Sequence, residues 1–224
     1  MTAEAAVVVT IAGPSASGKS TLAGLLAAEL GELAPAILRQ DDYFRDFAEF
    51  DEAERERVRT ANHPSAVLWE SFHEALDTLT AGGRVLQPAP GTRGRSRGLR
   101  ERWLGPGRLI IVEGLFALWD ERSRDRADLR VYLEVDEDER VLRRLHRDIA
   151  ERGGTLERSV AWYRRDVAPN YPLYTAPSRQ YADLVVPTNH AVDVAVSALR
   201  EAIRGIAAAR LGAHTDRVAG DDGR

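Results

Sequence analysis

One eight-residue stretch near the start of the chain constrains the fold more than any other. Residues 13–20 read GPSASGKS, which fits the pattern GxxxxGK[ST]. A β-branched run at residues 5–11 precedes the stretch, as expected for a strand buried on both faces, and residues 21–30 read as a helix. Strand, glycine loop and helix in this order direct backbone N–H groups and a helix N-terminus at an anion. We therefore expect this stretch to bind phosphate.

The pattern also predicts roles for single residues of the loop. Lys19 would reach the β- and γ-phosphates of a nucleotide, and Ser20 would place its hydroxyl on Mg²⁺. Gly13 and Gly18 would supply backbone freedom and close approach. The residues expected to contact the nucleotide are Gly13, Ser15, Ala16, Ser17, Gly18, Lys19, Ser20 and Thr21.

Composition sets bounds on the class of protein. The chain has 224 residues, of which 44% are hydrophobic, which suits one α/β domain with a full core. The net charge of −4 gives no reason to expect nucleic acid or an anionic membrane as a partner. There are no cysteines, and no apolar run approaches the ~20 residues of a membrane span. We expect a soluble, cytoplasmic protein with a single domain at 1–211 and a disordered tail at 212–224.

Two acids follow predicted strands. Asp41 comes directly after the strand at 36–40, and Glu113 lies at the end of the aliphatic strand at 108–114. Ligands of doubly wound sheets lie outside the carboxyl ends of the strands, so both acids should face the loop. Asp41 is the candidate to accept a proton from, or orient, an attacking hydroxyl, although it could simply cap a turn. Glu113 is expected to hold Mg²⁺ opposite Ser20.

Two segments are rich in arginine. Residues 88–107 are irregular and basic, and they could be a solvated loop or could bring an arginine to an anionic substrate. A helix that starts after Asp136 carries an arginine at nearly every exposed turn. These arginines could pair with nearby acids. Since phosphoryl transfer needs mobile positive charge, we expect some of them to form a closing lid.

The rest of the chain completes an α/β pattern. Further strands are predicted at 130–135 and 183–186, which makes five strands in all. Helices are predicted from Ser65 to the glycines at 82–83 and from Val192 to Leu211, because apolar residues recur there at helical spacing.

Six separated blocks resemble the uridine kinase and phosphoribulokinase branch of the P-loop kinases, over roughly residues 7 to 205. The blocks are GPSASGKST at 13–21, QDDYF at 40–44, NHP at 62–64, VEGLFAL at 112–118, RRLHRDIAERG at 143–153 and PSRQYADLVVP at 177–187. The resemblance implies a P-loop NTPase fold, with a five-stranded parallel sheet, helices on both faces and a mobile lid at about 137–155. It further implies catalytic roles for Asp41 as base, for Lys19 at the nucleotide, and for Arg144 and Arg147 in the lid, with Ser20 and Glu113 at the metal.

The acceptor side departs from that family. Uridine and cytidine kinases have a block that looks like DHP, whose aspartate holds ribose hydroxyls, whereas this chain has Asn62. Their block resembling PxYDFxxHxR, whose tyrosine and histidine enclose the base, is replaced by PAPGTRGRSR at 88–97. An arginine and a glutamine past the lid are replaced by Gly154 and Trp162. The motifs that bind ATP in that family are therefore present in this chain, whereas those that bind the nucleoside are replaced by other residues.

These observations predict an ATP- and Mg²⁺-dependent kinase that acts on a hydroxyl of a small molecule. The residues expected to contact the acceptor are Asp41, Tyr43, Asn62, His63, Arg95 and Arg144. A different nucleoside, a sugar, or an acid such as glycerate or pantothenate all stay open as acceptors, the acids because of Arg93, Arg95 and Arg97. A nucleotide-binding module without kinase activity stays open as well. Homo-oligomer formation is left open too.

Overall fold

A computed structural model describes residues 6–188 and 192–221 and contains a parallel five-stranded sheet in the order β2-β5-β1-β6-β7. The strands are β1 (Val7–Ala12), β2 (Pro35–Arg39), β5 (Leu109–Glu113), β6 (Leu129–Glu134) and β7 (Leu184–Pro187). Every pairing in this sheet is parallel. The predicted α/β class, the five parallel strands and the helices on both faces are confirmed.

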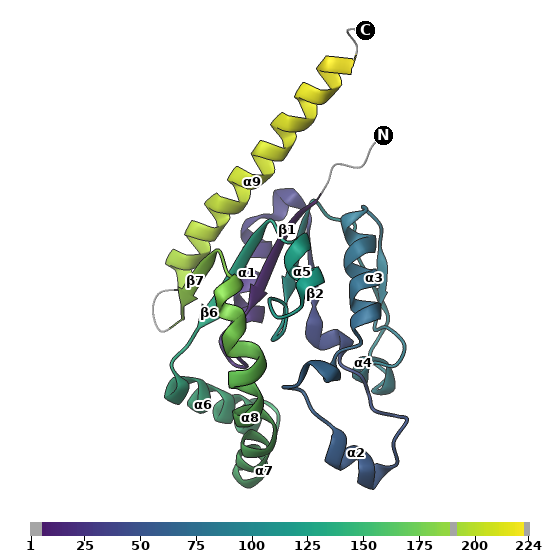
Figure 1. Ribbon diagram of the computed structural model, residues 1–224, viewed down its shortest axis with the longest axis vertical. Coiled ribbons are helices and arrows are strands. Elements are labelled where there is room, and N and C mark those ends of the chain that lie inside the picture. Colours follow the sequence, from purple (N-terminus) through teal and green to yellow (C-terminus); the bar gives the residue numbers. More distant parts are fainter. Residues whose placement is uncertain (1–5, 189–191, 222–224) are drawn as a thin grey trace.

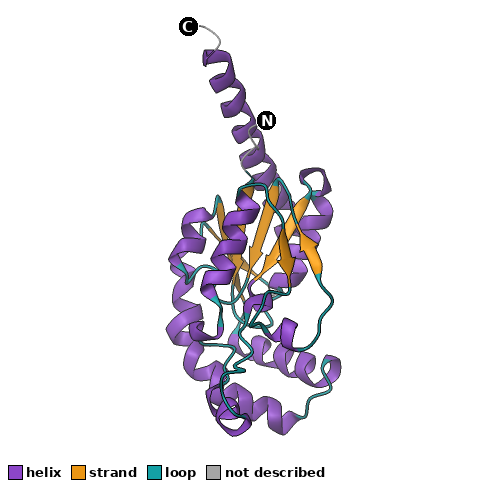
Figure 2. Cartoon of the chain, turned by 90° about the vertical axis from the view of Figure 1, so that its right-hand side faces the viewer, coloured by secondary structure: helices purple, strands orange, loops and turns teal. Residues whose placement is uncertain are grey.

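Helices cover the sheet on both faces (Figure 2). The α-helices are α1 (Lys19–Glu29), α2 (Glu52–Val58), α3 (Trp69–Thr80), α4 (Arg93–Ser96), α5 (Glu121–Arg126), α6 (Glu137–His146), α7 (Leu156–Trp162), α8 (Ala168–Asn170) and α9 (Val192–Asp221). The 3₁₀ segments are η1 (Gly31–Leu33), η2 (Gln40–Tyr43), η3 (Pro64–Ala66) and η7 (Ala176–Tyr181), and the π-helical segments are η4 (Arg147–Glu151), η5 (Tyr163–Val167) and η6 (Tyr171–Thr175).

The core has two parts, because the strands are apolar on both faces. On one face Leu26 of α1 and Leu199 of α9 pack with Val9 of β1. On the other face Phe72 and Leu76 of α3 pack with the alternate strand residues. Burial on both faces explains why these strands read as continuous aliphatic runs.

Two elements in the middle of the chain differ from the expectations. An antiparallel hairpin of β3 (Val85–Gln87) and β4 (Arg102–Leu104) brackets α4 in the basic segment, which was expected to be irregular. Helix α3 begins at Trp69, because Pro64–Ala66 forms a separate 3₁₀ turn.

The predicted end of the last helix at Leu211 is wrong, because α9 continues to Asp221. The helix therefore includes residues 212–221 of the predicted tail, and residues 222–224 lie outside the described residues. This segment contains no proline, and alanines 207–209 favour continuation of the helix. Figure 1 shows the end of α9 projecting beyond the sheet.

The strands end together at one edge of the sheet. Glu113 of β5 stands opposite Ile11 of β1 and opposite Arg39 of β2. This register places the loop after β1, the turn after β2 and the end of β5 side by side. Figure 1 shows these ends directed toward the part of the molecule that carries α6, α7, α2 and α4. Within the described residues, no helix is both long and apolar enough to cross a membrane.

Candidate active site

The glycine loop connects β1 to α1 as a tight, close-packed turn. Gly13 has a φ of +147°, and a Cβ there would lie 2.6 Å from the carbonyl oxygen of Leu133, so no larger residue fits. Gly18 has a φ of +91° and is the N-cap of α1. Ala16 has a positive φ of 67°, which is unusual for a residue with a Cβ. These constraints hold the loop in one conformation.

The glycine loop and the start of α1 contain hydrogen-bond donors without acceptors in the described part of the chain. The backbone N–H groups of residues 18–21 have no acceptor among the described residues, and the buried hydroxyl of Ser17 has no partner there either. The Lys19 ammonium donates to the carbonyls of Gly13 and Pro14 at 2.9 and 2.8 Å. The oxygens of a polyphosphate could accept hydrogen bonds from these N–H groups, as anions do at the start of a helix.

The structure brings the side chains of Ser20 and Glu113 together. The Ser20 hydroxyl donates to Oε1 of Glu113 at 2.8 Å, and Arg39 lies 3.9 Å from the same oxygen. Burial raises the pKa of Glu113, an effect that Lys19 opposes. Burial also lowers the pKa of Lys19, which Glu113 and Asp41 oppose. Two opposite charges are thus held close together in a partly dry site.

The same two oxygen groups suit a magnesium ion, which prefers oxygen ligands and commonly shares them with substrate phosphates. In residues 6–188 and 192–221 there is no group of three or more acidic, histidine or cysteine side chains that could hold a metal. A magnesium ion at Ser20 and Glu113 would therefore depend on nucleotide oxygens for the rest of its ligands.

Asp41 lies on η2, the turn that follows β2, and is exposed. Its carboxylate is close enough to Lys19 and Glu113 to affect the pKa of both groups. The neighbouring Gln40 is fully buried, and its Oε1 accepts from the backbone N–H of Phe116 at 2.8 Å. Gln40 thus fastens the turn that carries Asp41 to the turn after Glu113.

The predicted lid arginines contact the glycine loop directly. Arg144 of α6 and Arg147 of η4 both donate to the hydroxyl of Ser15, at 2.9 and 3.2 Å. Asp148 lies 3.4 Å from Arg144 and 3.2 Å from Arg147, and it also pairs with Arg152 at 3.3 Å. One carboxylate therefore holds the arginines over the loop.

Asn62 and His63 lie in a polar network with Asp166, Ser65 and Tyr174. The Asn62 amide donates to Asp166 at 2.6 Å, and the same carboxylate oxygen accepts from the N–H of Ala61 at 3.0 Å. His63 Nδ1 accepts from the N–H of Ser65 at 3.1 Å, so the ring proton belongs on Nε2, which lies 2.8 Å from the Tyr174 hydroxyl. The network fixes both side chains, and Asp166 is its centre.

Two residues predicted to contact the acceptor lie elsewhere. Tyr43 is 2% exposed and packs edge-on against Phe72, so it belongs to the core. Arg95 is exposed and paired with Glu101. In its place the structure turns Arg93 inward, against the segments around Arg45 and Thr60.

Sequence reasoning did not select Gln40 or Asp166 as site residues, and it named Arg93 only together with Arg95 and Arg97 as a reason to consider an acidic acceptor. Gln40 could have been noticed, because it directly precedes Asp41 in a recognised block. No local sequence pattern could have identified Asp166, because it lies 104 residues from Asn62 in the chain.

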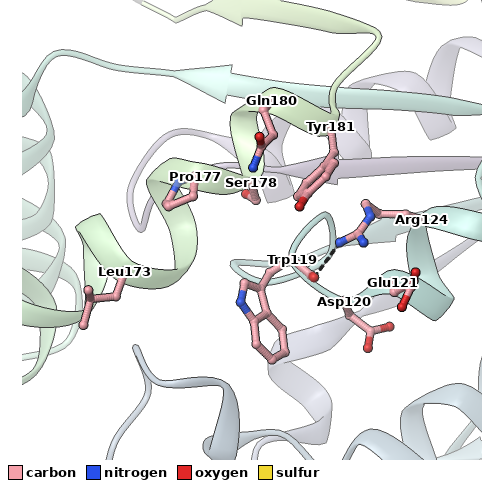
Figure 3. Close-up of a pocket in the computed structure, with 9 residues that line it drawn as sticks. All are labelled: Trp119, Asp120, Glu121, Arg124, Leu173, Pro177, Ser178, Gln180 and Tyr181. Atoms are coloured by element: carbon pink, nitrogen blue, oxygen red, sulfur yellow. Dashed lines mark hydrogen bonds between the residues drawn. The ribbon is translucent and has the colours of Figure 1, made fainter.

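Two hollows lie near these groups. A largely apolar pocket of about 300 Å³ adjoins the loop and is lined by Ser17, Gly18, Thr21, Leu22, Leu133, Arg143, Val186, Pro187, Thr188 and Ala195. A second cavity of about 480 Å³ contains none of the predicted site residues. Figure 3 shows Trp119, Arg124 and Tyr181 around it, with a guanidinium nitrogen of Arg124 donating to the Trp119 carbonyl at 2.6 Å.

The fold and the site together define a phosphotransferase of the P-loop class. The chain belongs to the phosphoribulokinase / uridine kinase family, whose model matches residues 8–195.

Curated relatives and solved structures agree with this assignment. The chain is 34% identical to a uridine kinase of Lactiplantibacillus plantarum, over 89% of this chain and 95% of that protein. It is 33% identical to a uridine kinase of Deinococcus deserti, over 88% and 95% respectively. A putative fructose transport system kinase from Silicibacter sp. TM1040 superposes with a TM-score of 0.62 at 25% identity, over 82% of this chain and 90% of that one. Phosphoribulokinase from Rhodobacter spheroides shares the fold, with a TM-score of 0.58 at 18% identity over 84% and 74%.

Proposed function

We propose that this protein transfers the γ-phosphoryl group of ATP to a hydroxyl of a small molecule, with Mg²⁺ as the metal. The main observation that supports this proposal is the strand register, because it brings Asp41, Glu113 and the glycine loop to one edge of the sheet. Residues 18–21 and Lys19 would bind the triphosphate, and the apolar pocket beside Gly18 and Leu22 suits the base of the nucleotide. Ser20 and Glu113 would hold the metal, which would supply positive charge against the phosphates.

Asp41 would accept the proton of the attacking hydroxyl. The acceptor oxygen forms a bond to the γ-phosphorus, the bond to the β-phosphate oxygen breaks, and ADP leaves. Arg144 and Arg147 would turn from Ser15 to the transferring group, where they offset its charge and exclude water. The names of the curated relatives make uridine the first acceptor to try, and a cytoplasmic location would give access to ATP.

A nucleotide-binding module without kinase activity is the competing function, because much of the family's nucleoside-binding pattern is missing. The variant Asp41→Asn separates the two. For a kinase, kcat should fall by roughly 10²- to 10⁴-fold while the affinity for ATP is kept. Asp42→Asn is the matched control, since Asp42 lies on the same turn but pairs with Arg102 at 3.2 Å. Equal kcat values for the wild type and Asp41→Asn would show that Asp41 does not act as the base.

A further inference from the structure

Arg93 lies beside the turn that carries Asp41. Its backbone N–H donates to the carbonyl of Phe44 at 2.9 Å, which fastens α4 to the end of η2. Its guanidinium lies over the rings of Phe44 and Phe47, 5.2 and 5.9 Å from their centres. The two rings and the backbone bond fix the position of this cation relative to Asp41.

The partners of this guanidinium are uncharged. Nε donates to the carbonyl of Arg45 at 3.2 Å, and Nη2 donates to the carbonyl of Thr60. Nη1 has no hydrogen-bond partner in the described part of the chain, and no carboxylate there lies within 4.0 Å of Arg93. Three other arginines of these segments have ion-pair partners: Arg45 with Glu49, Arg95 with Glu101, and Arg102 with Asp42.

More positive charge surrounds Arg93. Burial lowers the pKa of Arg93 to about 10, and the like charges of Arg59 and Arg97 add to this effect. A cation that is partly removed from water without a counter-ion is unfavourable, so an anion bound there would be stabilised.

The two acids that interact electrostatically with Arg93 also interact with other groups. Asp41 and Asp166 both interact electrostatically with Arg93, but Asp166 is engaged in holding residues 60–62. Asp41 also interacts with Lys19 and Glu113 at the phosphate loop. An acceptor whose hydroxyl lies at Asp41 would therefore have the phosphate loop on one side and Arg93 on another.

We propose that the acceptor carries an anionic group, a carboxylate or a phosphate, and that Arg93 binds this group through its open Nη1 donor. Arg59 and Arg97 strengthen the positive field around that group. The inference rests on the proposed kinase function and narrows its acceptor. An uncharged nucleoside would leave the guanidinium of Arg93 without a counter-ion.

The first experiment measures acceptor-dependent ADP release by the full chain with ATP and Mg²⁺, using acceptors paired by charge. The pairs are pantothenate with pantothenol, glycerate with glycerol, and ribose 5-phosphate with ribose, and uridine is added as an uncharged nucleoside. In whichever pair the enzyme phosphorylates, kcat/KM should be about tenfold or more higher for the charged compound than for the uncharged one. The carboxylate and phosphate pairs distinguish the two sources of the anion.

The second experiment does not depend on having the right acceptor. With Mg²⁺ and ADP present to fill the phosphate loop, sodium sulfate is compared with sodium chloride at constant ionic strength by thermal unfolding. Sulfate should raise the Tm of the wild type by about 2 °C or more, and this rise should be lost in Arg93→Gln. Arg95→Gln is the matched control on the same helix, and its rise should be kept. Arg97→Glu provides a variant at an exposed position that leaves the contacts of Arg93 in place, and the rise should shrink there too.

The outcomes separate this inference from the kinase function. Preference for uridine over every charged compound, or an equal sulfate effect in wild type and Arg93→Gln, would overturn the inference and leave the kinase standing. Loss of the sulfate effect in Arg95→Gln instead of Arg93→Gln would also overturn it. Failure of the purified chain to bind ATP would overturn the proposed function itself.

Discussion

Arg144 and Ser15 are joined by a hydrogen bond of 2.9 Å, although they lie 129 residues apart in the chain. The bond connects α6 to the glycine loop and places the Arg144 guanidinium directly against that loop. A phosphate oxygen that entered the loop would be a stronger partner for this guanidinium than a neutral hydroxyl, since hydrogen bonds between ionised groups are about twice as strong.

We expect Arg144→Gln to lower kcat by roughly 10²- to 10³-fold, because the transferring group would lose positive charge in the transition state. Steady-state kinetics with saturating ATP measure this. Arg152→Gln is the matched control, since Arg152 pairs with the same Asp148 at 3.3 Å but is exposed. Similar losses in both variants would mean that the lid acts only through its total charge.

Glu113→Gln should raise the Mg²⁺ concentration needed for half-maximal activity by about tenfold or more, because a carboxylate ligand is replaced by an amide. Titration of activity with MgCl₂ measures the change, and EDTA should abolish turnover in both proteins. The control is Glu134→Gln at the end of the neighbouring strand β6, where the carboxylate pairs with Arg179 at 2.7 Å. An unchanged Mg²⁺ requirement in Glu113→Gln would argue against a metal at this position.

Asn62→Asp would create the aspartate of the DHP block but should destabilise the protein. The new carboxylate would face Asp166 at the present 2.6 Å contact, in a place where Asn62 is 5% exposed. Two buried carboxylates at that distance should cost about 2–4 kcal/mol of unfolding free energy. The double variant with Asp166→Asn should recover most of the loss, as measured by urea unfolding. Full stability of Asn62→Asp would show that the pair can separate.

Asp183→Asn should lower stability at neutral pH but not in acid. Asp183 accepts from the Arg130 side chain at 3.0 and 3.1 Å and from its backbone N–H at 2.8 Å, which connects β7 to β6. Burial by itself would raise the pKa of Asp183, but the hydrogen bonds from Arg130 outweigh it, so this pKa is below the ordinary value of 3.8.

The ionised carboxylate is thus favoured in the folded state, and its contribution is present above pH 3.8 and lost as the pH falls through the lowered pKa. The difference between wild type and Asp183→Asn should be about 1 kcal/mol at pH 7 and should vanish near pH 2. Urea unfolding at both pH values measures it, and a difference that is independent of pH would contradict an ionic origin.

The strands and the glycine loop could be predicted because their signals are local. A strand buried on both faces needs a continuous aliphatic run, and the loop needs glycines at fixed spacing, so both features are written in adjacent residues. The positions of Asp41 and Glu113 followed, because parallel strands place their carboxyl ends at one edge.

The acceptor side could not be predicted in the same way. Arg93 and Arg95 lie two residues apart on a four-residue helix, and which of them turns inward depends on how α4 packs on η2. Tyr43 lies two residues after Asp41, yet its ring packs against a helix that begins 26 residues later in the chain. Asp166 approaches Asn62 only through the tertiary fold. Each of these depends on long-range packing, which no local pattern encodes.

The strand register that joins Glu113 to Ile11 and Arg39 has an evolutionary consequence. The groups proposed for the phosphoryl donor stand at the edge of the central sheet, whereas Arg93 belongs to the segment between β3 and β4, which form a separate hairpin. A change in that segment could exchange one acceptor for another while the donor groups stayed intact, so a single scaffold could diversify across substrates by changing about twenty residues.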